Sequence, residues 1–135
     1  MNSKDIQYLE AIGEYCDEID ATIKRFGADF KTFCSDSDYY NSVLMTLFQI
    51  GELVNKLSDD ARAVLDEQIE SHKIIAVRNR IAHAYDGLDE AVIWDIASKH
   101  LAGLRDFCAK QVEKNAHLLT DIDIELIESF SKSSK

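Results

Sequence analysis

The sequence predicts an all-α fold built as one domain. Its 135 residues, 46% of them apolar, are the right size for a single hydrophobic core. The chain has no proline and five glycines, while 30% of its residues are charged. This composition favours helices over a sandwich or barrel, which would need many tight turns. Apolar residues also recur every three or four positions in long segments, as in amphipathic helices.

Two long helices are predicted in the N-terminal half. The first covers residues 6–26, and Gly27 follows where a left-handed C-terminal cap is expected. A connector rich in Ser and Asp occupies residues 35–38. The helical spacing then returns over residues 40–57, which predicts the second long helix.

Two glycines lie inside these predicted helices. Gly13 and Gly51 each lower helix stability by about 1 kcal/mol relative to alanine. We expect close approach of a neighbouring helix to explain both.

Three further helices are predicted in the C-terminal half: a short one, one that we call the motif helix for the sequence described below, and a long last core helix. The short helix covers residues 58–65 and leads into a helix over residues 71–85. A turn and an N-cap are expected at residues 86–89. The last core helix is predicted over residues 93–112. A final short helix is expected over residues 120–130, although Ile122, Ile124 and Leu126 alternate as in a strand.

The formal charge of −10 opposes nonspecific binding to nucleic acid or to an anionic membrane. Between Ser71 and Tyr85, however, the chain has no acidic residue and three cations: Lys73, Arg78 and Arg80. This segment therefore carries +3 and leaves −13 on the rest of the chain. An anion-binding surface is expected to be centred here.

Cysteines and histidines give no sign of a disulfide or a metal site. The three cysteines are odd in number, far apart and not preceded by a signal-peptide core, which predicts reduced thiols packed in the core of a cytoplasmic protein. The four histidines are too scattered for a metal site, and no cofactor is expected. The longest apolar runs are too short to cross a bilayer, so no membrane partner is expected.

The motif helix contains the sequence RNRIAHAY at residues 78–85, and its faces differ. At 100° per residue, Ile74, Val77 and Ile81 share one stripe, which we expect to be buried. His83 points about 180° from Ile74, and Asn79 stands beside it one turn earlier.

A second apolar side, formed by Ile75 and Ala82, makes this helix two-sided, and a homodimer is the simplest partner for it. In such a dimer each copy would bring Arg78 and His83 to the seam. The seam would then form a basic groove suited to a phosphodiester.

The same residues also fit a purely structural interpretation. His83 could be an ordinary surface histidine. Arg78 could be a snorkelling arginine paired with Glu52. Tyr85 could pack in the core with a solvated hydroxyl, and Asn79 could bond a neighbouring backbone group.

The pattern Arg78-Asn79-x-x-x-His83-x-Tyr85 resembles the Arg-x4-His-x-Tyr signature of the HepT branch of the HEPN superfamily. Phe48-Gln49-Ile50-Gly51-Glu52 resembles the Ile-Gly-Glu stretch of that branch, and residues 89–104 resemble its last helix. The resemblance covers about residues 4–112 of a single domain spanning 1–135, with a C-terminal extension over about 113–135.

The resemblance implies an up-and-down helical bundle, with a four-helix core and short extra helices, that forms a homodimer through its motif helices. It also implies that the protein acts as a metal-independent endoribonuclease, the toxin of a toxin-antitoxin pair. Arg78 and His83 would be catalytic, with Asn79 supporting them. The partner would be a minimal nucleotidyltransferase antitoxin, which silences the toxin by transferring AMP from ATP to Tyr85. AMP there would place bulk and negative charge where an RNA phosphate must lie.

The chemistry also follows from the residue types. The 2′-hydroxyl of RNA can attack its own adjacent phosphate once a base removes its proton. Histidine titrates near neutrality and suits that task, while an arginine can hold two phosphate oxygens as charge builds on them. The cations Lys73 and Arg80 are further candidates for binding RNA.

Two rival hypotheses remain open. In one, the helical dimer is catalytically inactive and serves as a binding partner for a nucleotidyltransferase, which the net charge favours slightly. In the other, the bundle is a structural oligomer whose histidine has no catalytic role.

Overall fold

The computed structural model describes residues 1–118 and 128–129, and the side chain of Tyr85 is not among those described. All regular structure in these residues is helical, which confirms the all-α prediction. The helix predicted over residues 120–130 lies largely outside the described residues.

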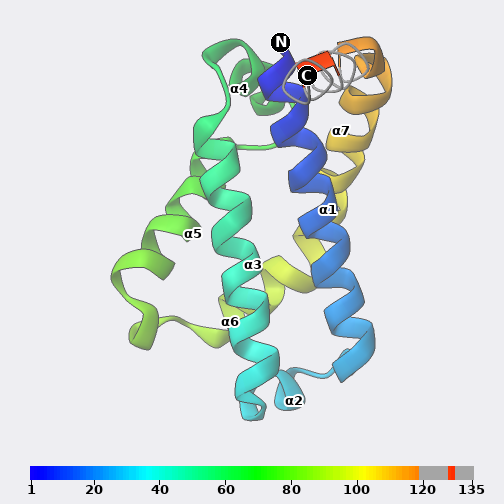
Figure 1. Cartoon of the computed structure of the whole chain (residues 1–135). Coiled ribbons are helices and arrows are strands. Elements are labelled where there is room, and N and C mark those ends of the chain that lie inside the picture. Colours follow the sequence, from blue (N-terminus) through cyan, green and yellow to red (C-terminus); the bar gives the residue numbers. More distant parts are fainter. Residues whose placement is uncertain (119–127, 130–135) are drawn as a thin grey trace.

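Four helices form the bundle: α1 (Ser3–Phe26), α3 (Ser37–Lys56), α5 (Ser71–His83) and α7 (Leu101–Lys114). α1 packs along α3 and α7, and α5 packs along α3, so α5 lies at one side of the bundle (Figure 1). The shorter elements are α2 (Phe30–Ser35), α4 (Asp59–Asp66), the 3₁₀ turn η1 (Tyr85–Gly87), α6 (Glu90–Asp95) and the π-helical segment η2 (Ile96–His100).

α1 begins and ends at strong local signals. Asn2 and Asp5 form a reciprocal capping box, which satisfies backbone N–H groups of the first turn. At the other end Gly27 has φ 107° and ψ 136°. The positive φ explains the glycine, although the ψ value differs from that of the left-handed helical cap that we expected.

Asp5 also ties α1 to α4. Its buried carboxylate accepts hydrogen bonds from the Ser58 N–H at 2.9 Å and the Ser58 hydroxyl at 2.7 Å. Ser58 in turn is the N-cap of α4. Burial acts to raise the pKa of Asp5, but the hydrogen bonds from Ser58 and Asn2 outweigh it, so the pKa lies below its ordinary value.

The connector predicted over residues 35–38 is wrong, because the break is a single residue. Asp36 ends α2 and also caps α3, accepting hydrogen bonds from the N–H groups of Asp38 and Tyr39. α2 itself was not predicted. Its buried Phe33 packs against Tyr39 and Trp94, which places Trp94 in an aromatic cluster at this end of the bundle.

We predicted one uninterrupted last core helix, but the structure divides it into α6 and α7. α6 and α7 are joined by the π-helical segment Ile96–His100, whose wider turns bring side chains five residues apart closer together than an α-helix does. His100 Nε2 consequently lies 3.0 Å from a carboxylate oxygen of Asp95.

The two helical glycines have different environments. A Cβ at Gly51 would lie 2.3 Å from Cβ of Arg78, so α3 and α5 approach too closely here for any side chain. A Cβ at Gly13 would meet Cβ of Cys108 at 3.6 Å, an ordinary contact. The close-approach prediction is therefore confirmed for Gly51 and wrong for Gly13.

Candidate functional site

α5 is held in place at both ends. Ser71 at its start is buried, and its N–H donates to a carboxylate oxygen of Asp66 at 2.9 Å. Near its end Ile81 is buried in the core with 4% of its surface exposed. Ile74 and Val77, expected on the same buried stripe, are half-buried because they line a groove.

The polar residues of the motif lie on different faces of α5. Asn79 and His83 are exposed, as predicted for the outward face, and Arg80 is exposed too. Arg78 and His83 are five residues apart, which separates them by about 140° around the axis and about 7.5 Å along it. Arg78 faces α3, and His83 faces outward.

Tyr85 is not on the motif helix, contrary to our prediction. α5 ends at His83, and the chain turns into the 3₁₀ segment that begins at Tyr85. The neighbouring residues Ala84, Asp86 and Gly87 are exposed. The tyrosine therefore follows the helix in a surface turn, two residues from His83.

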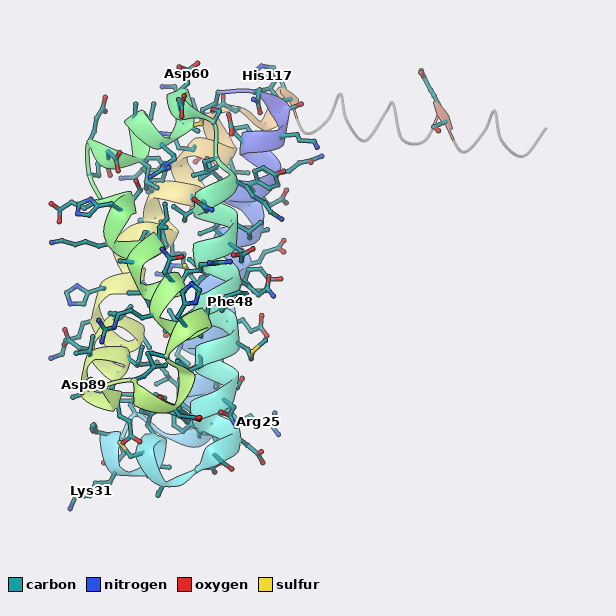
Figure 2. All side chains as sticks on the ribbon, turned by 90° about the vertical axis from the view of Figure 1, so that its left-hand side faces the viewer. Arg25, Lys31, Phe48, Asp60, Asp89 and His117 are labelled. Atoms are coloured by element: carbon teal, nitrogen blue, oxygen red, sulfur yellow. The ribbon has the colours of Figure 1, made fainter. Side chains whose placement is uncertain are left out.

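The guanidinium of Arg78 is held by three neighbours. Its Nε donates to a carboxylate oxygen of Glu52, forming an ion pair whose side chains are 27% and 29% exposed. The Cζ atom of Arg78 lies 5.1 Å from the ring centroid of Phe48, which is a cation–π contact. Phe48 lies on α3 beside α5, at mid-height of the bundle (Figure 2).

Asn79 is the third neighbour, and Arg78 fixes which way its amide points. Nη1 of Arg78 lies 3.0 Å from Oδ1 of Asn79. Because arginine has only donors, the Asn79 atom facing it must be the oxygen. The NH₂ group of Asn79 is therefore directed away from Arg78, and it donates to none of the described side chains.

Two of the three cations counted in this segment are already paired. Lys73 forms an ion pair with Glu70, and Arg78 forms one with Glu52. Hydrogen bonding to Lys73 lowers the pKa of Glu70. Among the described residues Arg80 makes no ion pair, so the expected basic surface is weaker than the sequence charge indicated.

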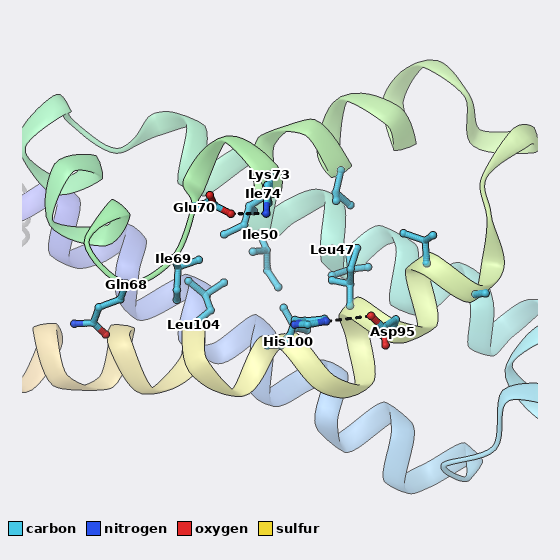
Figure 3. A pocket seen from close by; sticks show the side chains of 15 residues that line it. Leu47, Ile50, Gln68, Ile69, Glu70, Lys73, Ile74, Asp95, His100 and Leu104 are labelled. Atoms are coloured by element: carbon cyan, nitrogen blue, oxygen red, sulfur yellow. Dashed lines mark hydrogen bonds and ion pairs between the residues drawn. The ribbon is translucent and has the colours of Figure 1, made fainter.

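An apolar groove of about 770 Å³ lies beside α5, between that helix and the segment formed by α6, η2 and the start of α7. Figure 3 shows Ile74, Ile50, Leu47 and Leu104 directed into it. Polar contacts stand on its two rims: the ion pair of Lys73 with Glu70 on one, and the contact of His100 with Asp95 on the other. Hydrogen bonds from Lys99 and His100 lower the pKa of Asp95.

Sequence reasoning missed the role of Phe48 and the pairing of His100. Phe48 and Glu52 are four residues apart on α3, so helical spacing could have shown that both face Arg78. The Asp95–His100 pair depends on the π-helical segment, which no local pattern in the sequence indicates. Within the described residues, no group of three or more potential metal ligands gathers, and no helix is long and apolar enough to span a membrane.

Comparison with known proteins agrees with the motif resemblance. The family described as Ribonuclease HepT-like matches residues 7–111, which include both α3 and α5. The chain is also 27% identical over 124 residues to the protein named "Putative RNase MJ1216" of Methanocaldococcus jannaschii, covering 91% of this chain and 94% of that relative. No solved structure matches the chain. The match over most of the sequence shows that this chain belongs to the HepT-like ribonuclease family.

Proposed function

We propose that this chain is a metal-independent endoribonuclease, the toxin of a toxin-antitoxin pair. The observation that carries the proposal is the arrangement on α5. A clamped arginine, Arg78, is joined to Asn79, and an exposed histidine, His83, stands one turn beyond Asn79. The whole arrangement lies within the part of the chain that matches the family.

These groups can perform RNA cleavage without a metal. His83 removes the proton from the 2′-hydroxyl, whose oxygen then attacks the adjacent phosphorus. Arg78 and the NH₂ group of Asn79 donate to the phosphate oxygens as negative charge builds on them. The bond from phosphorus to the 5′ oxygen breaks, and that oxygen takes a proton. The products are a 2′,3′-cyclic phosphate and a 5′-hydroxyl.

A homodimer would supply the second proton-transfer group, since one His83 can act as base while the other, protonated, acts as acid. The second apolar side of α5, where Ala82 is exposed and Ile75 is half-buried, supports association of a second copy through this helix. Light scattering after gel filtration measures the oligomeric state directly.

The test of the nuclease is cleavage of a mixed RNA by purified protein in excess EDTA, with analysis of the 3′ ends. Wild-type protein should give cyclic-phosphate ends, and His83→Ala should give none. His72→Ala is the matched control, because His72 is an exposed histidine on the same helix outside the motif. Equal cleavage by His83→Ala and wild type would refute the role of His83.

The proposed regulation is AMPylation of Tyr85 by a minimal nucleotidyltransferase. The tyrosine oxygen would attack the α-phosphorus of ATP, releasing pyrophosphate and leaving AMP on the ring oxygen. The exposed turn that begins at Tyr85 supports access by a second protein. Intact mass should show one added AMP after incubation with the antitoxin and ATP, and none in Tyr85→Phe.

One observation favours the inactive binding module as a second candidate. Two of the three cations of α5 already have carboxylate partners, which weakens the attraction of the helix for RNA. This candidate predicts a complex with the nucleotidyltransferase that survives His83→Ala, and no RNA cleavage by unmodified protein.

A further inference from the structure

The stem of Arg78 is fixed by the contact between α3 and α5. At Gly51 the two helices are so close that an added Cβ would lie 2.3 Å from Cβ and 2.9 Å from Cγ of Arg78. The first carbons of the arginine therefore lie directly on the glycine backbone. This contact sets the point from which the guanidinium extends.

The guanidinium itself is fixed by two other residues of α3. Phe48 and Glu52 are one turn apart, so they present a ring and a carboxylate on the same face. The ring lies against the guanidinium, and the carboxylate accepts the Nε hydrogen. The position and the rotation of the planar group are both defined by α3.

This pairing determines how Arg78 can hold a phosphate. Of the five N–H donors of a guanidinium, Glu52 takes the one on Nε and Asn79 takes one on Nη1. Bidentate binding through Nε and Nη2 is therefore blocked. The end of the guanidinium, with Nη1 and Nη2, is left for an anion and lies on the side of Asn79.

We propose that Glu52 is a positioning residue for Arg78, a role that deepens the proposed ribonuclease function and rests on it. Glu52 partly neutralises the charge that attracts RNA, so it does not serve binding. Its contribution is to hold the guanidinium in one orientation, with its free donors beside the NH₂ group of Asn79. A long, flexible arginine without this partner would sample other orientations, and small misplacements of a catalytic group lower rates strongly.

The test is the kinetics of Glu52→Gln in the RNA cleavage assay. We expect kcat to fall about 10- to 100-fold, as misplacing a group by about 1 Å does, while KM stays the same or decreases. Glu10→Gln is the matched control, because Glu10 is exposed on α1, and it should leave both constants unchanged. In an Arg78→Ala background, Glu52→Gln should cause no further loss, since it acts only through Arg78.

A second measurement does not depend on activity. In an NMR spectrum of the arginine Nε–H groups, the Arg78 signal should exchange slowly with water in wild type. It should exchange rapidly in Glu52→Gln, and Arg78→Lys identifies the signal. Unchanged circular dichroism of Glu52→Gln would show that the fold persists.

The outcomes separate this inference from the proposed function. An active wild type together with an equally active Glu52→Gln would overturn the positioning role alone. So would an additional loss from Glu52→Gln in the Arg78→Ala background, or a rapidly exchanging Arg78 signal in wild type. A wild type that cleaves no RNA, with a protected Arg78 signal, would overturn the ribonuclease function and leave Glu52 as a structural partner only.

Discussion

Replacing Gly51 with alanine tests the close contact of α3 and α5. Helix propensity alone predicts that Gly51→Ala stabilises the protein by about 1 kcal/mol. The structure predicts the opposite sign. The new Cβ would lie 2.3 Å from Cβ of Arg78, which is 1.1 Å short of the 3.4 Å at which ordinary contact begins. The nearest opposing atom is Cβ of Arg78, whose position is set by the backbone, so side-chain rotation cannot remove the clash.

The magnitude follows from these two opposing effects. Overpacking of this kind costs about 1–3 kcal/mol, and contact with atoms close to the backbone places this case in the upper part of that range. After subtracting the gain in helix propensity, we expect Gly51→Ala to lower the free energy of unfolding by about 1–2 kcal/mol.

Gly13→Ala is the matched control. Its Cβ would meet Cys108 at 3.6 Å, an ordinary contact, so this variant should gain about 1 kcal/mol. Urea unfolding followed by circular dichroism measures both, at one protein concentration because association would add to stability. With a slope of about 2 kcal/mol per molar urea, the two midpoints should differ by about 1 M or more. A rise in midpoint for Gly51→Ala equal to that of Gly13→Ala would refute the reasoning.

Three further predictions concern separate parts of the molecule. Asp5→Ala should lower the free energy of unfolding by about 3 kcal/mol, since it leaves the N–H and hydroxyl of Ser58 without their charged acceptor. Because the pKa of Asp5 is lowered in the folded protein, its contribution is present above about pH 4 and is lost as the pH falls through the folded value. The stability gap between wild type and Asp5→Asn, measured by urea unfolding, should therefore narrow in acid; a gap that is constant down to pH 2 would contradict this. Burial raises the pKa of Cys16 and Cys108 to about 12, so a thiol reagent should modify neither in the native protein and both after unfolding, as counted by intact mass. Rapid native labelling of either thiol would count against this packing. Asn79→Asp should reduce RNA cleavage by at least about 10²-fold, because it replaces a donor with a negative charge beside Arg78, whereas Asn79→Ala should lose less; the reverse order would contradict the donor role.

Local signals in the sequence predicted most of the fold. The apolar spacing located α1, α3 and α5. The short helix predicted from Ser58 is α4, and Asp89 acts as the N-cap that its residue type indicated. α2 was missed because it has only six residues, too few to show a helical period. The π-helical segment was missed because its apolar spacing resembles that of a continuous helix.

The candidate site was predictable in composition and less so in geometry. The faces of α5 followed from helical angles, so the outward positions of Asn79 and His83 were predicted correctly. The sequence did not predict that α5 ends at His83 and leaves Tyr85 in a turn, because Ala84 is not a residue that stops helices. The sequence offered Glu52 as one of two interpretations of Arg78, and only the contact at Gly51 shows why that pairing forms.

The internal pairing of Lys73 and Arg78 bears on how RNA binding would respond to salt. Affinity for a nucleic acid comes largely from the counterions released when free cations replace them at the phosphates. A cation that is already paired with a carboxylate displaces fewer counterions from the nucleic acid. Among the described cations of α5, only Arg80 lacks an ion-pair partner. For a single strand the logarithm of affinity changes with the logarithm of salt by about −0.7 per phosphate contact, so each protomer should contribute a slope close to that of one contact. Recognition of RNA by this protein should therefore persist at salt concentrations that release strongly basic RNA-binding proteins.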